Sequence, residues 1–527
     1  MPISLSHILL ILLGILILIL LFQYGGVFES LRALKGYGAR VVLGIAALGA
    51  LGGLLYRSTS YMTPERERWI THGRVPGDSI SLGYDDKSRF RSLAQPLGKI
   101  LDRNGALLAG YKLSGHLRRT YPGGGATAHI VGYWTGPLRD GVGVEKALTM
   151  VNDSLRDDMP HDVSLSLDLR LQREALAALG NDIGAIVVMD ASNGEVLVAA
   201  NNPTYDPNSI WSDPAWKRFV VDTIRRPLTS RAIKDNFSPG SSIKPFVAAA
   251  AYHLNATLPE FNGFVCTGSY VPIPDTRPIT EHGSAHGAVD IARAMRYSCN
   301  IYFSKLAYQI IGFDATKSYL DGIGFDDRLR WNTGIFLNEY ATLLPARSWV
   351  KGRDEIAKSR LGIGQASVKT NPVHMATMLA GIANGGLFYR PTLEVGRPPD
   401  TLKWRMDNGT ASRVEALLRE PLLPGGTAAG AFGGPIARGI TIFGKTGTAD
   451  MEPDGREPSW FISYGRKNGR TYAVVVAIQN RRGLFAGSLN APMARRMYEA
   501  LDGLGYYKAA APPAPVRPPA KGSAKKP

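Results

Sequence analysis

The chain has 527 residues, of which 45% are hydrophobic and 20% are charged, so it is longer than one ordinary domain and can bury a sizeable core. Its formal net charge of +17 comes from dispersed basic residues, a pattern that argues against nucleic-acid binding and favours attraction to anionic lipid or cell-wall polymer. With two cysteines only, Cys266 and Cys299, a disulfide framework is excluded.

The same two cysteines bear on metal binding. Neither a C-x-x-C nor an H-E-x-x-H pattern occurs, so these common short metal-binding motifs are missing from the sequence. We therefore expect two free thiols, no metal and no other cofactor. A single bridge between Cys266 and Cys299 is the alternative.

The chain begins with a segment that predicts a transmembrane helix over residues 1–24. This segment contains no Lys, Arg, Asp or Glu, and the run 8–22 consists of Leu, Ile and Phe with one interruption at Gly14. A cleavable signal peptide is the alternative. However, the basic stretch that precedes the apolar core of a signal peptide is missing, and no clean small-residue cleavage site follows.

A second apolar stretch, residues 41–56, is bracketed by Arg40 and Arg57. It is short for a membrane span unless Arg40 extends its charged end toward the interface, and we expect a second crossing there. The connecting loop 25–40 has three basic side chains and one acidic side chain, so the positive-inside rule places it in the cytoplasm. Both ends of the protein would then lie outside the cytoplasm.

Residues 57–161 predict a small mixed pedestal domain, because short hydrophobic runs are interrupted by Gly and Pro. The composition changes at residue 162, where apolar and polar residues alternate before a helical pattern over 169–179. We place the start of the main domain there and expect it to extend over residues 162–507. The remaining residues, 508–527, are rich in Ala, Pro and Lys and predict a disordered tail.

Five β-rich runs come from the two ends of the main domain. One pair flanks Asn193-Gly194 and another flanks Asn468-Gly469, both strong hairpin signals that imply mostly antiparallel pairing. The segment between them, roughly 227–384, has more helical patterns, among them 376–382. The expected fold is therefore α+β, a five-stranded mostly antiparallel sheet flanked by helices with an all-helical lobe. The five predicted strands are 185–189, 196–200, 441–448, 460–464 and 471–478.

A last helix is predicted near the end of the main domain. Asn490 would be its N-cap with Pro492 just inside the first turn. Four apolar side chains recur at helical spacing and would face the sheet: Met493, Met497, Leu501 and Leu504.

The first chemical motif is Ser241-Ser242-Ile243-Lys244, which follows Pro239-Gly240. At the start of a helix, residues three apart face the same side, so a hydroxyl would lie beside an amine. A serine needs a base to become a nucleophile, and a lysine can serve only if burial or neighbouring charge lowers its pKa. A surface Ser and Lys at ordinary helix spacing is the alternative for this motif alone.

Two further motifs follow in order, Ser298-Cys299-Asn300 and Lys445-Thr446-Gly447-Thr448. If the backbone at the first is extended, Ser298 and Asn300 project to one side, where they offer a hydroxyl for proton relay and an amide for substrate. Cys299 would then point away as a small packed side chain.

The third motif lies at the end of a predicted strand. Gly447 lacks a side chain, which lets an extended substrate approach the strand edge. Lys445 supplies positive charge, Thr446 and Thr448 offer hydroxyls to a carboxylate, and the backbone N–H groups of Ser241 and Thr448 could form an oxyanion hole.

The order S-x-x-K, S-x-N, K-T-G is the signature set of penicillin-binding proteins and serine β-lactamases. The chain resembles the class B, monofunctional penicillin-binding proteins, which are peptidoglycan D,D-transpeptidases. The resemblance covers roughly 162–504. It is carried by the segments 202–208, 238–245, 297–300 and 444–448.

The resemblance implies a role for each matching residue. Ser241 would be acylated by a donor stem peptide or by a β-lactam, Lys244 would be the acylation base, and Ser298 would relay a proton. Asn300 would bind a substrate amide. Three residues would engage the terminal carboxylate, namely Lys445, Thr446 and Thr448.

The resemblance also implies a setting, the bacterial cytoplasmic membrane with the catalytic domain on the extracytoplasmic side. Membrane lipids and donor and acceptor stem peptides would be partners. No glycosyltransferase domain fits between residues 57 and 161, so a separate SEDS-type glycosyltransferase would polymerise glycan. The chain departs from the family pattern in its short pedestal, its second crossing and Gly364-Gln365-Ala366, where the family often has a second Gly, so Gln365 is given only a supporting role.

Several alternatives remain open at this point. A β-lactamase shares the motifs but needs a base for deacylating water, and Asp354 and Glu355 lack a recognisable context. A D,D-carboxypeptidase would differ only in which nucleophile reaches the acyl-enzyme. A β-lactam-sensing receptor would need an output domain, which the predicted loop of residues 25–40 does not offer. A non-catalytic scaffold would not require five intact motif residues.

Overall fold

The computed structural model describes residues 97–508 apart from 115, 135–140, 149–161, 212, 255–263, 275, 326–328, 334–353, 366–367, 433–438, 451–456 and 480–484. The predicted membrane segments 1–24 and 41–56, the loop 25–40 and the tail after residue 508 lie outside these residues and stay predictions. Within the described part of the chain, no helix combines the length and apolar character needed to cross a bilayer.

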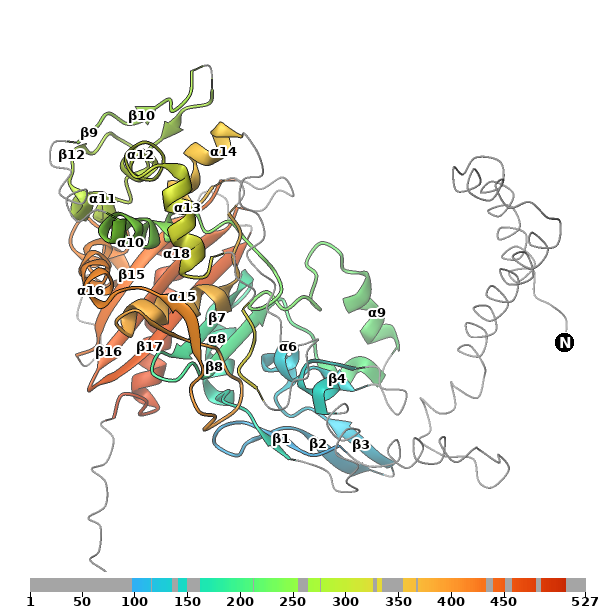
Figure 1. Cartoon of the computed structure of the whole chain (residues 1–527). Coiled ribbons are helices and arrows are strands. Elements are labelled where there is room, and N and C mark those ends of the chain that lie inside the picture. Colours follow the sequence, from blue (N-terminus) through green and yellow to red (C-terminus); the bar gives the residue numbers. More distant parts are fainter. Residues whose placement is uncertain are drawn as a thin grey trace, which may run out of the picture. The chain divides into compact units, whose positions relative to one another are not determined.

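A five-stranded antiparallel sheet organises the main domain (Figure 1). Its strand order is β15-β16-β17-β7-β8, so strands from the two ends of the domain pair directly and the predicted fold class is confirmed. Asn468 and Gly469 both have positive φ, 52° and 73°, as the two-residue hairpin between β16 and β17 requires. The strand bounds are β7 Ile183–Asp190, β8 Val196–Asn202, β15 Thr441–Thr448, β16 Ser459–Lys467 and β17 Arg470–Gln479.

Helices cover both faces of this sheet. Helix α15 (Pro372–Ala383) packs on one face, against β16, β17 and β7, while α8 (Leu169–Leu179) and α18 (Ala486–Gly503) pack on the other (Figure 1). Side chains alternate along each strand, so Val187 belongs to the core under α15 and Val188 to the core under α18. Strand β15 is the edge strand on the β16 side of the sheet.

The last helix begins earlier than the sequence predicts, because α18 starts at Ala486 with Phe485 as N-cap. Asn490 is not a cap: its side chain is buried and donates from Nδ2 to the carbonyls of Ser459 and Val476. The Asn490 side chain therefore forms hydrogen bonds with the sheet, whereas the local sequence predicts that it caps the helix. Met497 and Leu501 are buried as predicted, whereas Leu504 is 37% exposed.

The lobe beside the sheet is helical apart from two short ladders that the sequence pattern did not reveal. Strand β9 (Val265–Cys266) pairs with β12 (Gly287–Ala288), and β10 (Ser269–Tyr270) pairs with β11 (Ile279–Thr280). Two-residue strands are too short to show an alternating pattern. The lobe helices are α10 Lys244–Leu254, α11 Ile291–Tyr297, α12 Asn300–Lys305, α13 Phe313–Gly322 and α14 Glu355–Ser359, and α16 (Asn408–Leu417) packs on α10.

The described part of the pedestal is a small sheet, of order β3-β2-β1-β6. Its last strand, β6, follows the predicted domain boundary at 162, and side chains of β1 and β6 share the core under α15. A fully buried ion pair, Arg119 with Glu145, lies within it. The strand bounds are β1 Ile100–Leu101, β2 Leu107–Ser114, β3 His116–Thr120 and β6 Val163–Ser164.

Remaining described elements complete the chain. These are β4 Tyr133–Trp134, β5 Gly141–Val142, β13 Leu387–Tyr389, β14 Thr401–Arg405, α6 Ala128–Val131, α9 Asp213–Val221 and α17 Ala429–Phe432.

Candidate active site

Ser241 lies in a 3₁₀ turn, Gly240–Ile243, that leads directly into α10 at Lys244. The prediction of a helix start is thus confirmed, and Pro245 falls in the first turn, where a backbone N–H has no helical partner to bond. Gly240 has φ 53°, and a Cβ there would lie 2.4 Å from the carbonyl oxygen of Thr448. Only glycine fits, so the turn carrying Ser241 packs tightly against the end of β15.

The open edge of β15 presents its backbone toward this turn. Gly444 donates its N–H to Leu418 outside the sheet, while Ala449 donates to Pro458 at the start of β16. Because N–H groups of a strand alternate between its two sides, those of Thr446 and Thr448 point away from β16, toward the open edge. The predicted oxyanion donor on Thr448 therefore faces the side on which Ser241 lies.

The Ser298-Cys299-Asn300 motif is not extended, which corrects the sequence-based expectation. Ser298 has left-handed backbone angles, φ 59° and ψ 41°, and ends α11, while Asn300 begins α12. The N–H of Cys299 bonds to the carbonyl of Ala294, which closes the helix end in the Schellman pattern. A tight turn between two helices, rather than a strand, directs both polar side chains to the cleft.

Lys244 joins the first two motifs. Its Nζ donates to the Ser298 carbonyl at 2.5 Å, to Ser298 Oγ at 3.2 Å and to Asn300 Oδ1 at 2.8 Å. Asn300 in turn donates from Nδ2 to the Thr280 carbonyl, which fixes the orientation of its amide. The base, the relay hydroxyl and the amide that the sequence predicted are thus in direct contact.

Lys445 brings in the third motif. Its Nζ donates to Ser298 Oγ at 2.8 Å and to the carbonyl of Thr446 at 2.8 Å. The Thr446 hydroxyl donates to Oγ1 of Thr427, a residue that the sequence analysis did not single out. Ser298 Oγ therefore lies between two amines, each within hydrogen-bond distance.

Burial disfavours positive charge on both amines. It lowers the pKa of Lys244 to about 8, although Glu281 and Cys299 act in the opposite direction. Burial also lowers the pKa of Lys445 well below its ordinary value, and the nearby charge of Lys244 adds to this effect. Because the two amines share Ser298 Oγ, they titrate as a pair, and burial together with their mutual repulsion disfavours a positive charge on both at once.

Sequence reasoning missed Glu281, a buried carboxylate whose charge acts on Lys244. Burial alone would raise the pKa of Glu281, but the N–H groups of Asn300 and Ile301, together with Lys244, hold it below its ordinary value. The two N–H bonds are 2.9 and 3.0 Å and cap the start of α12. A lone Glu between two-residue strands carries no recognisable pattern, so only the structure could find it.

Gln365 occupies the supporting position that was predicted for it. Its Oε1 accepts the backbone N–H of Asp450, just beyond β15, at 3.1 Å. Gly364 before it has φ 65° and accepts the N–H of Gly240 at its carbonyl, 3.0 Å away. Ala366, where the sequence departs from the family pattern, lies outside the described residues.

The two candidate bases for deacylating water have structural partners instead. Asp354 caps α14 by accepting the N–H of Ala357. Glu355 accepts from Lys358 and Tyr308 on the surface. Neither carboxylate forms a described hydrogen bond with the Ser241, Lys244, Ser298 and Lys445 group.

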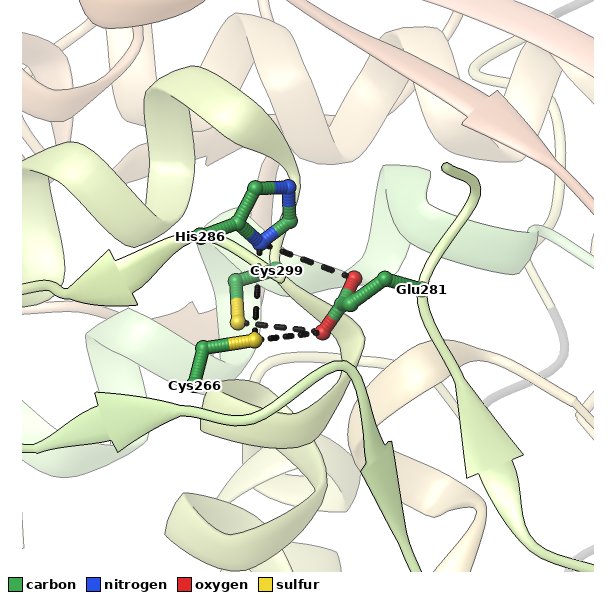
Figure 2. A group of neighbouring side chains, drawn as sticks. All are labelled: Cys266, Glu281, His286 and Cys299. Atoms are coloured by element: carbon green, nitrogen blue, oxygen red, sulfur yellow. Dashed lines mark hydrogen bonds and ion pairs between the residues drawn. The ribbon is translucent and has the colours of Figure 1, made fainter. Parts of the chain in front are cut away.

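Both cysteines are free and buried, as predicted. Cys299 donates its S–H to Glu281 at 3.1 Å, and burial raises the pKa of its thiol, which agrees with a packed side chain rather than a nucleophile. Cys266, Glu281, His286 and Cys299 nevertheless converge on one point (Figure 2), and together they could hold a metal ion. Their spacing matches no short metal motif, which is why the sequence analysis expected none.

The arrangement as a whole can perform acyl transfer. It combines a serine on a helix start, a buried amine whose pKa is lowered to about 8, a hydroxyl shared by two amines and a strand edge that carries Lys445 and outward N–H groups. Hydrogen bonds join Lys244, Ser298, Asn300 and Lys445 from three distant parts of the sequence, and Ser241 lies in the turn that leads into Lys244.

Comparisons with known proteins agree with this geometry. A family model described as "Penicillin binding protein transpeptidase domain" matches residues 184–499. The peptidoglycan D,D-transpeptidase PbpA of Mycobacterium tuberculosis strain H37Rv is 31% identical over 375 residues, which is 66% of this chain and 73% of the relative.

Solved structures show the same fold. An imipenem acyl-enzyme complex of penicillin-binding protein A from M. tuberculosis has a TM-score of 0.65 and 25% identity, covering 78% of this chain and 99% of its own. The crystal structure of Pseudomonas aeruginosa PBP2 in complex with WCK 5153 has a TM-score of 0.65 and 27% identity, covering 79% of this chain and 99% of its own.

Proposed function

Because the chain belongs to the penicillin-binding protein transpeptidase family, within its class B members, we propose that it is a membrane-anchored peptidoglycan D,D-transpeptidase acting through an acyl-enzyme at Ser241. The observation that carries this proposal is the contact of Ser298 Oγ with both Lys244 Nζ and Lys445 Nζ. Lys244 lies one turn after Ser241 in the chain. A scaffold would have no use for two buried amines whose hydrogen-bond partners, among the described residues, are hydroxyl, amide and carbonyl oxygens.

In the proposed acylation, Ser241 Oγ forms a bond to the penultimate D-Ala carbonyl of a donor stem peptide. Neutral Lys244 accepts the hydroxyl proton, and the backbone N–H groups of Ser241 and Thr448 stabilise the oxyanion. The peptide C–N bond then breaks, and the leaving D-Ala amine receives a proton through Ser298. An acceptor amine attacks the resulting ester, forms the cross-link and restores the Ser241 hydroxyl.

Substrate binding would itself prepare the base. The terminal carboxylate of the donor would lie near Lys445, Thr446 and Thr448, where its negative charge favours the ammonium form of Lys445. Since a positive charge on both amines at once is disfavoured, Lys244 is then the neutral amine. Gly447 keeps the strand edge close to the turn, because a Cβ there would lie 2.7 Å from the Pro239 carbonyl.

Labelling with a fluorescent penicillin tests the proposal. The full chain in detergent is expected to be labelled covalently and to lose the label over hours, whereas Ser241→Ala is expected to remain unlabelled. Ser242→Ala is the matched control, because Ser242 bonds back to the Pro239 carbonyl at 2.7 Å. Loss of label within minutes would indicate a β-lactamase, and labelling of Ser241→Ala would refute the assignment of the nucleophile.

Transpeptidation is distinguished from carboxypeptidation by the product. Incubation with a donor stem peptide and a D-amino acid acceptor is expected to give the exchanged peptide, read by mass spectrometry. Release of D-Ala without exchange would instead indicate a D,D-carboxypeptidase. We assign glycan polymerisation to a separate SEDS-type partner, since the described pedestal consists of small sheets and short helices.

The proposed anchor and its topology rest on the sequence pattern of residues 1–56. The topology can be tested with single introduced cysteines, because the native Cys266 and Cys299 are buried and should not react with a maleimide. In whole cells with a permeabilised outer layer, Lys217→Cys on the exposed face of α9 should react with an impermeant maleimide, whereas Ala33→Cys should not. Reaction at residue 33 would overturn the two-crossing topology.

A further inference from the structure

The open edge of β15 is closed just beyond Thr448. The N–H of Ala449 turns toward the start of β16, where it bonds to the Pro458 carbonyl at 2.9 Å. The N–H of Asp450 bonds instead to Gln365 Oε1 at 3.1 Å. Because N–H groups alternate between the two sides of a strand, Gln365 occupies the next position after Thr448 at which an extended peptide could pair. A substrate that follows β15 must therefore leave the edge beside Gln365.

The upstream part of the proposed donor peptide would leave the cleft at this point. Its terminal carboxylate would lie near Lys445 and Thr446 and its scissile carbonyl at the N–H of Thr448, so the preceding residue continues along the edge toward Asp450. Asp450 follows Thr448 by two residues, which is about 7 Å along an extended strand. The residue that precedes D-Ala-D-Ala, called the third donor residue below, would thus extend its side chain into the surroundings of Asp450.

Two arginines of the helical lobe lie at this exit. The Arg360 carbonyl accepts the N–H of Gln365 at 3.3 Å, and Arg360 Nη2 donates to the Arg277 carbonyl at 2.9 Å. Arg360 directly follows α14, and Arg277 lies shortly before β11. Arg360 is half-buried, whereas Arg277 and Asp450 are exposed. The bond to the Arg277 carbonyl holds the Arg360 guanidinium, so its positive charge has a defined position.

Asp450 supplies the opposite charge at the exit. Burial lowers the pKa of Arg360, the charge of Asp450 acts in the opposite direction, and Arg277 adds to the lowering, so the three charges lie close enough to interact. Among the described residues, however, no carboxylate oxygen lies within 4.0 Å of the Arg360 guanidinium. A guanidinium has five N–H donors, and the described hydrogen bond of this one uses Nη2. Arg360 and Asp450 can therefore both serve a ligand that carries an anionic and a cationic group.

We propose that Arg360 and Asp450 bind the side-chain end of the third donor residue when that end carries both a carboxylate and an ammonium group. The carboxylate accepts hydrogen bonds from Arg360, whose planar guanidinium suits a bidentate contact, and the ammonium faces Asp450. Partial burial of Arg360 reduces the screening of that contact by water. The residue 2,6-diaminopimelate, which is lysine with a carboxylate on its ε carbon, has such an end. This recognition rests on the proposed function and specifies its donor.

Matched donors test the inference. The full chain in detergent is incubated with a D-amino acid acceptor and with Nα-acetyl-Xaa-D-Ala-D-Ala, in which Xaa is 2,6-diaminopimelate, lysine or 2-aminopimelate. Lysine lacks only the carboxylate, and 2-aminopimelate lacks only the ammonium. We expect kcat/KM for exchange, measured by mass spectrometry, to be highest for diaminopimelate and at least about tenfold lower for lysine. Equal kcat/KM for diaminopimelate and lysine would overturn the proposal.

Single variants assign the two charges. Arg360→Met should lower kcat/KM for the diaminopimelate donor about tenfold and leave that for the lysine donor within about threefold of the wild type. Arg360→Lys keeps the charge without the bidentate geometry and should give an intermediate preference. Asp450→Asn should remove the preference for diaminopimelate over 2-aminopimelate.

Lys217→Met is the matched control, because it also removes one exposed positive charge, on α9 rather than at the exit (Figure 1). It should leave the order and the ratios of the three donors unchanged. An undiminished preference for diaminopimelate over lysine in Arg360→Met would refute the role of Arg360.

Penicillin labelling separates this inference from the proposed function. A penicillin has no zwitterionic side-chain end, so Arg360→Met should be acylated at Ser241 within about threefold of the wild-type rate, which also shows that the variant is folded. Labelling of wild-type Ser241 together with equal or no exchange of the three donors would refute the charge recognition and leave the acyl-enzyme intact. Absence of both labelling and exchange in the wild type would refute the proposed function, and this inference with it.

Discussion

Two regions of the molecule bury basic side chains completely, but one region supplies a carboxylate partner and the other supplies oxygen atoms without charge. In the pedestal, Arg119 meets Glu145 at two points, with distances of 2.8 and 3.1 Å, and both side chains are 0% exposed. In the cleft, Lys244 and Lys445 are equally buried, but the partners of their Nζ atoms among the described residues are hydroxyl, amide and carbonyl oxygens.

The pKa values of the basic groups in the two regions shift in opposite directions. Burial opposes the charge of Arg119, yet Glu145 outweighs it and raises the pKa of that guanidinium. Burial lowers the pKa of Lys244 to about 8. A compensated charge serves structure, whereas an uncompensated amine can lose its proton near neutral pH and act as a base.

The largest expected effect is on acylation, from removing the base. Lys244→Met keeps an unbranched side chain but cannot accept the Ser241 proton, so penicillin acylation should slow on the order of 10²–10⁴-fold. Stopped-flow fluorescence with a labelled penicillin measures the rate. The free energy of unfolding should stay closer to that of the wild type than in the Glu145 variant below, because a buried charge is removed. A rate within threefold of the wild type would contradict a general-base role.

The second effect is on stability, in the pedestal. Glu145→Gln leaves Arg119 charged and buried without a counter-ion, so the free energy of unfolding should fall by about 3–5 kcal/mol. Chemical denaturation monitored by fluorescence measures this change. The double variant Arg119→Met/Glu145→Leu removes both charges and should recover most of the loss. Equal losses in the single and double variants would show that packing, not charge, determines the effect.

The third effect is a pH dependence confined to the cleft. With a pKa of about 8, the neutral fraction of Lys244 should rise roughly fivefold between pH 7 and pH 8 and level off near pH 9. The acylation rate of the wild type should follow that curve, since the lysine acts in its deprotonated form. A rate that falls with increasing pH across this range would rule out neutral Lys244 as the base.

The smallest effect concerns the support around the cleft. Gln365→Ala removes one hydrogen bond to the N–H of Asp450, a bond worth about 0.5–1.5 kcal/mol. Acylation should slow less than about tenfold, because β15 is also held by its full pairing with β16. Gln365→Glu keeps an acceptor oxygen and should retain more activity. A loss as large as that of Lys244→Met would place Gln365 in the chemistry itself.

Local sequence determined much of this protein. Strands such as β7 and β17 are visible as β-rich runs beside Asn-Gly turns, because a hairpin depends on residues close together in the chain. Each of the three motifs is a segment of three or four residues that contains the reactive or binding groups, and the order of the motifs in the chain is the signature of the family. These motifs contain Ser241, Lys244, Ser298, Asn300 and Lys445.

How these segments meet depends on contacts between residues that lie far apart in the sequence. The left-handed turn at Ser298, the buried bonds of Asn490 and the carboxylate of Glu281 each depend on groups distant in sequence. The same is true of the convergence of Cys266 and His286 with Glu281 and Cys299, since two-residue strands leave no periodic signal. Local sequence patterns predict helices and strands, whereas burial and long-range hydrogen bonds determine which side chains come together in the site.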